Sequence, residues 1–225
     1  MKFEAILFDC DGVLVDSEPI TNGVLRDMLE EAGWALSAEE CMRRFIGKTV
    51  RSQAPLIEAR TGRPLTDAWM ADFYARRNAR LAAELQPIEG AVEAVRAVHA
   101  RLAGRIACAS GADRYKVEMQ LQMVGLATLF AGRVFSGHEM PASKPAPDVY
   151  LAAAAALGVA PARCLVVEDT VTGVTAGVAA GATVVGFSPT AFGHDAAQAL
   201  RGAGAVDVLM RMADLPAWME AGACD

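Results

Sequence analysis

The stretch Phe3-Glu-Ala-Ile-Leu-Phe-Asp-Cys-Asp-Gly12 decides the fold class of this chain. Its apolar residues predict a buried β-strand over residues 3–8, and the two aspartates Asp9 and Asp11 follow at the strand's end. In an extended strand, alternate side chains such as these point to opposite faces. Both carboxylates can face one site only if the chain bends after Asp9, and Gly12 permits such a bend.

Further strand patterns appear only from about residue 105 onward, and helix patterns separate them. We expect these strands near residues 105–110, 133–136, 165–169, 183–187 and 206–210. We expect helices between them over residues 113–124, 147–157 and 171–180. Strands that alternate with helices of this length predict βαβ units and a mostly parallel sheet. The fold class is therefore α/β, with a doubly wound (Rossmann-like) parallel sheet core.

Helix signals fill the long gap between the first strand and the second. Three helix starts are visible, at Ser17-Glu-Pro19, at the capping box Ser37-Ala-Glu-Glu40 and at Thr66-Asp67. A βαβ unit needs only about 30 residues, so this stretch is an insertion. We predict that residues 1–16 and 87–225 form the sheet core and that residues 17–86 form an inserted all-helical domain.

Composition excludes several classes of protein. The chain has 225 residues, 53% of them hydrophobic and 21% charged, which is a globular composition and rules out a disordered protein. The net charge of -6 argues against a nucleic-acid-binding protein. The apolar run Ala5–Phe8 is too short for a signal peptide, and the longest apolar stretch, Leu151–Ala160, is too short for a membrane span.

Cysteine usage indicates a reducing compartment. The five cysteines form no Cys-x-x-Cys pair, and an odd number cannot pair completely within the chain. Cys10, Cys108 and Cys164 lie in apolar runs, where buried and unreactive thiols usually occur. We therefore expect a cytoplasmic protein. No heptad run calls for a partner chain, so we expect a monomer that binds neither membranes nor nucleic acid.

Polar residues gather at the predicted strand ends, where an open parallel sheet binds its ligands. In chain order they are Asp9, Asp11, Ser110-Gly111, Lys144 and Glu168-Asp169. Several carboxylates cannot share a small site without a cation, and oxygen donors without His or Cys favour Mg²⁺. Ser110, the Gly111 amide and the charge of Lys144 can hold phosphate oxygens. Each motif alone also occurs in ordinary turns, but the ordered set predicts a site.

Four segments of the chain resemble, in order, the four motifs of the haloacid dehalogenase superfamily. They are Phe8-Asp-Cys-Asp-Gly-Val-Leu-Val-Asp-Ser-Glu18, Ser110, Ser143-Lys-Pro-Ala-Pro-Asp-Val-Tyr150 and Val167-Glu-Asp-Thr-Val-Thr-Gly-Val174. The resemblance covers the whole chain, and the helical insertion corresponds to the family's cap domain. Within the superfamily, the sequence is similar to the β-phosphoglucomutase-like phosphatases and mutases.

The resemblance implies a Mg²⁺-dependent phosphatase that hydrolyses a small phosphorylated metabolite, a sugar or sugar-acid phosphate. Asp9 would be the nucleophile and form an aspartyl-phosphate. Asp11 would protonate the leaving alcohol and then deprotonate the incoming water. The cap would close to exclude water while the ester is attacked.

The resemblance also assigns ligands to the metal and to the phosphate. The expected metal ligands are Asp9, the main-chain carbonyl of Asp11, Glu168 directly or through water, and Asp169. The expected phosphate ligands are Ser110, Gly111 and Lys144, and Lys144 would also neutralise charge during transfer.

Two other branches of the superfamily are disfavoured by Asp11, because haloacid dehalogenases proper and phosphonoacetaldehyde hydrolases both lack this second aspartate. Phosphonoacetaldehyde hydrolases use a cap lysine to form an imine, and Lys48 lies in the cap. A receiver-type signalling domain also combines an aspartate, Mg²⁺ and a lysine, but its aspartate follows the third strand and it has no cap.

A phosphomutase is the alternative that stays open. β-Phosphoglucomutases carry a cap histidine twelve residues after the nucleophile, and Thr21 occupies that position here. Thr21 therefore argues for the phosphatase. We expect Gly47, Lys48, Arg51 and Arg77 of the cap to select the substrate together with Thr21, although basic residues on helices are often only solvated.

Overall fold

The computed structural model describes residues 3–45, 48–189 and 195–221, and its chain divides into two compact units. The sheet unit comprises Met1–Val15 and Gln86–Asp225, and the helical unit comprises Asp16–Leu85. The boundaries expected from the sequence, after residues 16 and 86, lie one residue further along the chain.

The sheet unit is built on six parallel strands in the order β3-β2-β1-β4-β5-β6. These are β1 (Ala5–Phe8), β2 (Ile106–Ser110), β3 (Val134–Ser136), β4 (Cys164–Glu168), β5 (Thr183–Phe187) and β6 (Asp207–Leu209). The predicted α/β class with a parallel sheet is therefore confirmed. The strand order reverses direction between β1 and β4, and such a switch point is where open parallel sheets bind ligands.

Register brings the ends of the central strands to one level. Phe8 of β1 lies opposite Cys108 of β2 and Val167 of β4. All four residues of β1 are buried, as expected for a strand that helices cover on both faces. Asp9 follows Phe8, and Glu168 follows Val167, the residue opposite Phe8. Asp9 and Glu168 therefore lie side by side at the ends of neighbouring strands.

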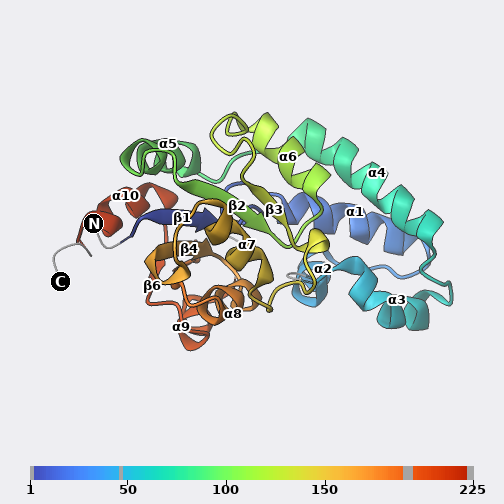
Figure 1. The fold of residues 1–225 in the computed structure, drawn as a ribbon. Helices are drawn as coiled ribbons and strands as arrows, with labels where there is room; N and C mark the ends of the chain where they lie inside the picture. Colours follow the sequence, from blue (N-terminus) through green and yellow to red (C-terminus); the bar gives the residue numbers. More distant parts are fainter. Residues whose placement is uncertain (1–2, 46–47, 190–194, 222–225) are drawn as a thin grey trace. The chain divides into compact units, whose positions relative to one another are not determined.

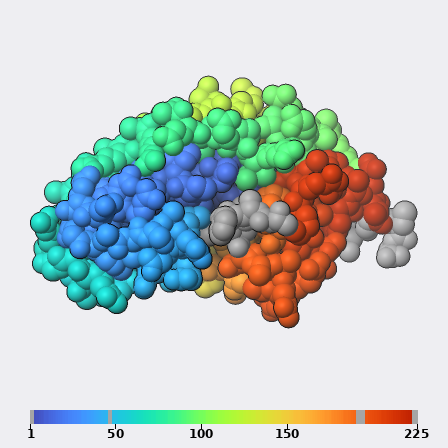
Figure 2. Space-filling view, turned by 180° about the vertical axis from the view of Figure 1, so that it is seen from behind, coloured from blue at the N-terminus to red at the C-terminus, as the bar shows by residue number. Residues whose placement is uncertain are grey.

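Helices cover the two faces of the sheet (Figure 1). One face carries α7 (Asp148–Ala156), α8 (Val171–Ala179) and α9 (Ala197–Gly202), which pack on Leu7, Val166 and other small apolar residues of the strands. The other carries α5 (Ala91–Arg101), α6 (Arg114–Met123) and α10 (Leu215–Ala221). Short 3-10 turns occur at Gly137–Glu139, Pro161–Arg163 and Met212–Asp214. Figure 2 shows the C-terminal part of this unit, in orange and red, as one continuous surface.

The helical unit has a core of its own. It contains α1 (Glu18–Glu31), α2 (Ala38–Phe45), a 3-10 turn (Val50–Gln53), α3 (Ala54–Thr61) and α4 (Asp67–Glu84). Leu25, Leu29 and Phe73 are among the residues buried inside it. The predicted capping box forms, because the Glu40 amide donates to Ser37 Oγ and the Ser37 amide donates to Glu40 Oε2. Helix α3 carries no start signal that the sequence analysis recognised.

Four of the five cysteines lie in the described residues. Cys10, Cys41, Cys108 and Cys164 are free thiols, and all four are buried. Within the described ranges, no helix has both the length and the apolar character needed to cross a membrane.

Candidate active site at the strand ends

A buried lysine connects the ends of the two strands at the switch point. Lys144, from the segment before α7, donates to Asp9 Oδ1 at 2.6 Å and to Glu168 Oε1 at 2.7 Å. The three side chains are 7%, 9% and 1% exposed, in the order Lys144, Asp9 and Glu168. Three residues that are far apart in sequence thus form one ion-pair bridge, shielded from solvent.

Burial and mutual repulsion shift the proton equilibria of this bridge. Burial, and then the charges of Glu168 and Asp11, raise the pKa of Asp9 from 3.8 to about 7, although Lys144 acts in the opposite direction. Burial lowers the pKa of Lys144, but the attraction of Asp9 and Glu168 outweighs it, and the net pKa lies well above the usual value. Lys144 therefore keeps its proton, while the pKa of Asp9 lies close to neutral pH.

Glu168 spends both of its oxygens on neighbouring donors. Oε1 accepts from Lys144 and from the Tyr150 hydroxyl at 3.0 Å. Oε2 accepts from the amides of Asp169 and Thr170 and from Thr170 Oγ1, at 2.9, 3.0 and 3.0 Å. A carboxylate offers about four lone-pair directions, so five donors saturate it. In this arrangement both oxygens of Glu168 are held by hydrogen bonds, one of them from Lys144.

Glycine is required beside this carboxylate. A Cβ added at Gly173, in the first turn of α8, would lie 1.7 Å from Glu168 Oε1. The amide of Gly173 donates to Thr170 Oγ1 at 3.1 Å, which caps α8. Within the segment of residues 167–173, β4 therefore ends, Thr170 caps α8, and Gly173 leaves room for the buried carboxylate of Glu168.

The donor set fits a small divalent cation. Asp9, Glu168 and Asp169 are three buried carboxylates beside the ammonium of Lys144. The surplus of negative charge is one cause of the raised pKa of Asp9, and a bound cation would relieve it. Oxygen donors suit Mg²⁺. Within the described ranges, no three Asp, Glu, His or Cys side chains form a group that could hold a metal ion by themselves. The expected set is of another kind, because it includes the main-chain carbonyl of Asp11.

Ser110 ends β2, the other neighbour of β1. Its side chain is buried, and its Oγ accepts a hydrogen bond from the Ala112 amide at 3.1 Å. Within the described part of the chain, its hydroxyl proton is donated to no other group, so it stays available to an oxygen of a ligand. A Cβ at Gly111 would meet nothing within 4 Å, so open space surrounds the backbone there.

Asp11 contacts two residues that the sequence analysis did not identify. Lys116 Nζ and Gln120 Nε2, both on α6, each lie 2.8 Å from Asp11 Oδ1. The only signal in the sequence is that a lysine and a glutamine stand four residues apart beside the apolar Val117 and Leu121. A lysine in a helix normally indicates the solvent face, and nothing local reveals that this one is buried.

The structure shows several contacts of the residues in the helical unit that were expected to select the substrate. Lys48 donates to the carbonyl of Arg44, and Arg51 pairs with Asp67 at 2.9 Å on the surface. Arg77 is 6% exposed, bonds to Asn78 Oδ1 and lies 4.8 Å from the Tyr74 ring centroid. Thr21 Oγ1 is buried and makes no hydrogen bond in the described residues. Gly47 lies outside the described residues.

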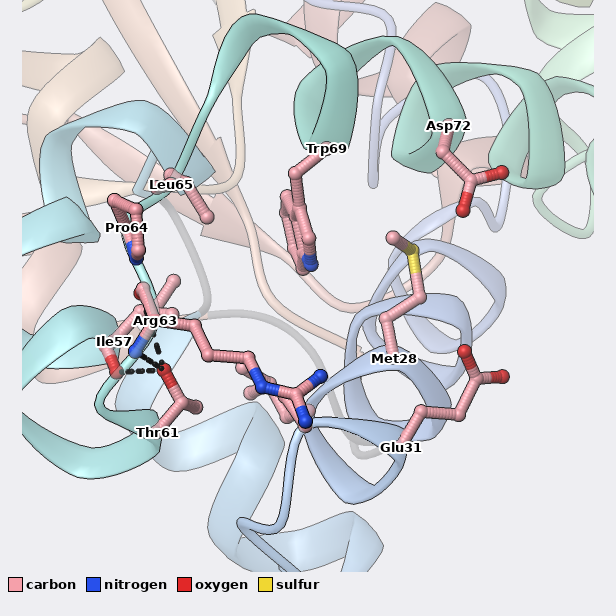
Figure 3. Close-up of a pocket in the computed structure, with 11 residues that line it drawn as sticks. Met28, Glu31, Ile57, Thr61, Arg63, Pro64, Leu65, Trp69 and Asp72 are labelled. Carbon is pink, nitrogen blue, oxygen red and sulfur yellow. Dashed lines mark hydrogen bonds between the residues drawn. The ribbon is translucent and has the colours of Figure 1, made fainter.

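The helical unit also holds a pocket of its own, of about 230 Å³ (Figure 3). Met28, Leu65 and Trp69 line it with apolar side chains, and Arg63 and Asp72 line it with charged ones. Thr61 beside it is held by hydrogen bonds with the carbonyl of Ile57 and the amide of Arg63. None of the described residues expected to select the substrate lines this pocket.

Comparison with known proteins gives evidence of family membership that does not depend on the geometry of the site. The sequence matches the haloacid dehalogenase-like hydrolase family over residues 3–181. It is 32% identical to the 6-phosphogluconate phosphatase of Escherichia coli over 83% of each chain. It is 31% identical to hexitol phosphatase B of Escherichia coli, over 78% of this chain and 79% of that one. A HAD family hydrolase from Deinococcus radiodurans, solved with bound phosphate and sodium, superposes with a TM-score of 0.79 at 36% identity, covering 98% of this chain and 97% of that one.

Proposed function

The chain belongs to the haloacid dehalogenase-like hydrolase family, and we propose that it is a Mg²⁺-dependent phosphatase for a small sugar or sugar-acid phosphate. The observation that carries this proposal is the buried bridge from Asp9 through Lys144 to Glu168 at the switch point of the sheet. This bridge places Asp9, the proposed nucleophile, beside the ammonium group of Lys144, which keeps its proton. The names of the two Escherichia coli relatives support the substrate class.

In the first step, an oxygen of Asp9 attacks the phosphorus of the substrate. The bond from phosphorus to the alcohol oxygen breaks, and Asp11 gives that oxygen a proton. In the second step, Asp11 takes a proton from water while the water oxygen attacks the phosphorus. The bond from Asp9 to phosphorus then breaks, and inorganic phosphate leaves.

The remaining residues of the site bind and orient. Lys144 would place its charge on an oxygen of the transferring group, and Glu168 would hold Lys144 there. The Ser110 hydroxyl and the Gly111 amide would donate to the other phosphate oxygens. The proposed ligands of Mg²⁺ are Asp9, the main-chain carbonyl of Asp11, Asp169 and, directly or through water, Glu168. The bound ion would neutralise charge that develops on the phosphoryl group.

The test is phosphate release from a panel of phosphorylated compounds, with Mg²⁺ and with a chelator. The panel includes 6-phosphogluconate, hexitol phosphates, hexose phosphates and an aryl phosphate. We expect release that needs Mg²⁺ and that concentrates on one or two sugar or sugar-acid phosphates. Release that is unaffected by the chelator, or absent from every compound, would contradict the proposal.

A phosphomutase is the competing outcome of the same experiment. It would isomerise a hexose phosphate once a sugar bisphosphate is added and would release little phosphate. Thr21, in place of the histidine expected of a mutase, favours the phosphatase.

A further inference from the structure

Two side chains of α6 converge on one oxygen of Asp11. Lys116 Nζ and Gln120 Nε2 both lie 2.8 Å from Asp11 Oδ1. Lys116 is 4% exposed and Gln120 is fully buried. Gln120 is held at its other end as well, because its Oε1 accepts a hydrogen bond from Cys10 Sγ at 3.5 Å. The two donors to Asp11 Oδ1 are therefore held in place themselves, Lys116 by burial and Gln120 by burial and a further hydrogen bond.

Packing alone does not explain these two residues. They are four residues apart, so they share one face of the helix with the buried Val117 and Leu121. Removing a lysine ammonium from water is costly unless an opposite charge compensates it. Asp113 caps the helix by accepting from the Lys116 amide at 2.9 Å, which fixes the turn that carries the lysine. An apolar pair would fill the same face without any such cost.

We propose that Lys116 and Gln120 are positioning residues that fix the proton-transfer oxygen of Asp11. The inference rests on the proposed function, in which Asp11 is the general acid and base. Two N–H donors aim at Oδ1, so a proton carried on Oδ1 would face both of them. The proton that Asp11 gives to the leaving alcohol therefore sits on Oδ2, and the two donors prevent the carboxyl group from rotating.

The role predicts a dependence on the leaving group. An alkoxide is a poor leaving group and needs the proton from Asp11 as the bond to phosphorus breaks. A p-nitrophenolate leaves without one. The ratio kcat/KM covers only the steps up to the first irreversible bond cleavage, so the later hydrolysis of the aspartyl-phosphate does not enter. A loss of positioning should therefore affect sugar phosphates far more than p-nitrophenyl phosphate.

The experiment compares kcat/KM for the best sugar phosphate and for p-nitrophenyl phosphate in K116M, Q120L and K116R. For K116M we expect a loss of about 10²-fold with the sugar phosphate, and of about threefold or less with the aryl phosphate. Q120L should show a smaller split in the same direction, and K116R should recover part of the loss. Arg114, on the exposed side of the same helix, pairs with Glu139, and R114M is the matched control that should change neither value.

Equal losses on both substrates, or no loss on either, would overturn the inference. Circular dichroism checks that each variant folds, and Q120L carries the test if K116M does not. The proposed function is judged separately by the wild-type protein and by D9N with p-nitrophenyl phosphate. If the wild type hydrolyses neither substrate, the proposed function is wrong and the inference is wrong with it. If wild-type hydrolysis is normal and the split is absent, only the inference is wrong.

Discussion

Charged residues of the two units form similar ion pairs in different surroundings. In the sheet unit, Lys144 meets Asp9 and Glu168 at 2.6 and 2.7 Å, and all three side chains are at most 9% exposed. In the helical unit, Arg76 meets Glu31 and Asp72 at 2.7 and 3.0 Å, and those side chains are 43–59% exposed. The distances match, so distance does not distinguish the two groups.

Solvent decides what each group can do. Around Arg76, water screens the charges and already solvates each partner, so the pairs contribute little to folding. Around Lys144, little water is present to screen, and the pKa of Asp9 rises to about 7. Burying a group of charges lowers the stability of the fold and shifts the pKa values of its members. An exposed group changes stability and pKa values little. Three substitutions and one change of pH should separate the buried group from the exposed one.

Asp9→Asn should abolish phosphate release, by about 10⁴-fold or more, because an amide cannot serve as the nucleophile. The matched change in the helical unit, Asp72→Asn, removes a carboxylate from an exposed ion pair and should leave turnover unchanged. Phosphate release under saturating substrate and Mg²⁺ measures both variants. Turnover by Asp9→Asn near the wild-type rate would show that another group attacks phosphorus.

Gly173→Ala should destabilise the protein by about 3 kcal/mol, because the new methyl group overlaps Glu168 and forces the buried carboxylate to move. At Gly202, in α9, an added Cβ meets nothing within 4 Å, so Gly202→Ala is the control and should change stability by less than about 1 kcal/mol. Urea unfolding of both variants gives the comparison. Equal stabilities of the two would mean that the strand end tolerates displacement of Glu168.

The stability cost of the Asp9 charge should depend on pH. The folded-state pKa of Asp9, about 7, lies above its ordinary value of 3.8, so the folded protein binds this proton more tightly than the unfolded chain does. The resulting stabilisation is complete below the lower value and is lost as pH rises through the upper one. Asp9→Asn removes this dependence, so its Tm relative to wild type should increase between pH 5 and pH 8.

Thermal unfolding of wild type and Asp9→Asn across that range, with chelator present, measures the change. A difference in Tm that stays constant with pH, or that decreases, would contradict the raised pKa of Asp9.

Arg76→Met should have the smallest effect of the four. It removes the exposed pairs with Glu31 and Asp72 together, and we expect Tm to change by no more than about 3 °C and activity not at all. Differential scanning calorimetry and the phosphate-release assay measure the two quantities. A large fall in Tm would show that these surface pairs act as a network that supports the helical unit.

The predictability of each part of the chain followed from how local its signals are. The strand expected over residues 3–8 forms over Ala5–Phe8, and the capping box at Ser37 forms as expected, because both depend on neighbours in sequence. The 3-10 turn Val50–Gln53, which Thr49 caps, and α3 were not predicted. The side chain of Gln53 does not cap α3, and a proline in the first turn was the remaining local signal. Tyr150 and Thr170 were visible inside recognised motifs, but their hydrogen bonds to Glu168 were not.

The α/β class, the helical insertion and the polar residues at the strand ends follow from the amino-acid sequence, since each depends on periodicity or on a contiguous motif. Only the tertiary structure decided which of those residues work together. Lys116 reaches Asp11 across 105 positions, and Lys144 reaches Glu168 across 24. Burial and the direction of a side chain depend on the elements packed around it, and no local pattern records them.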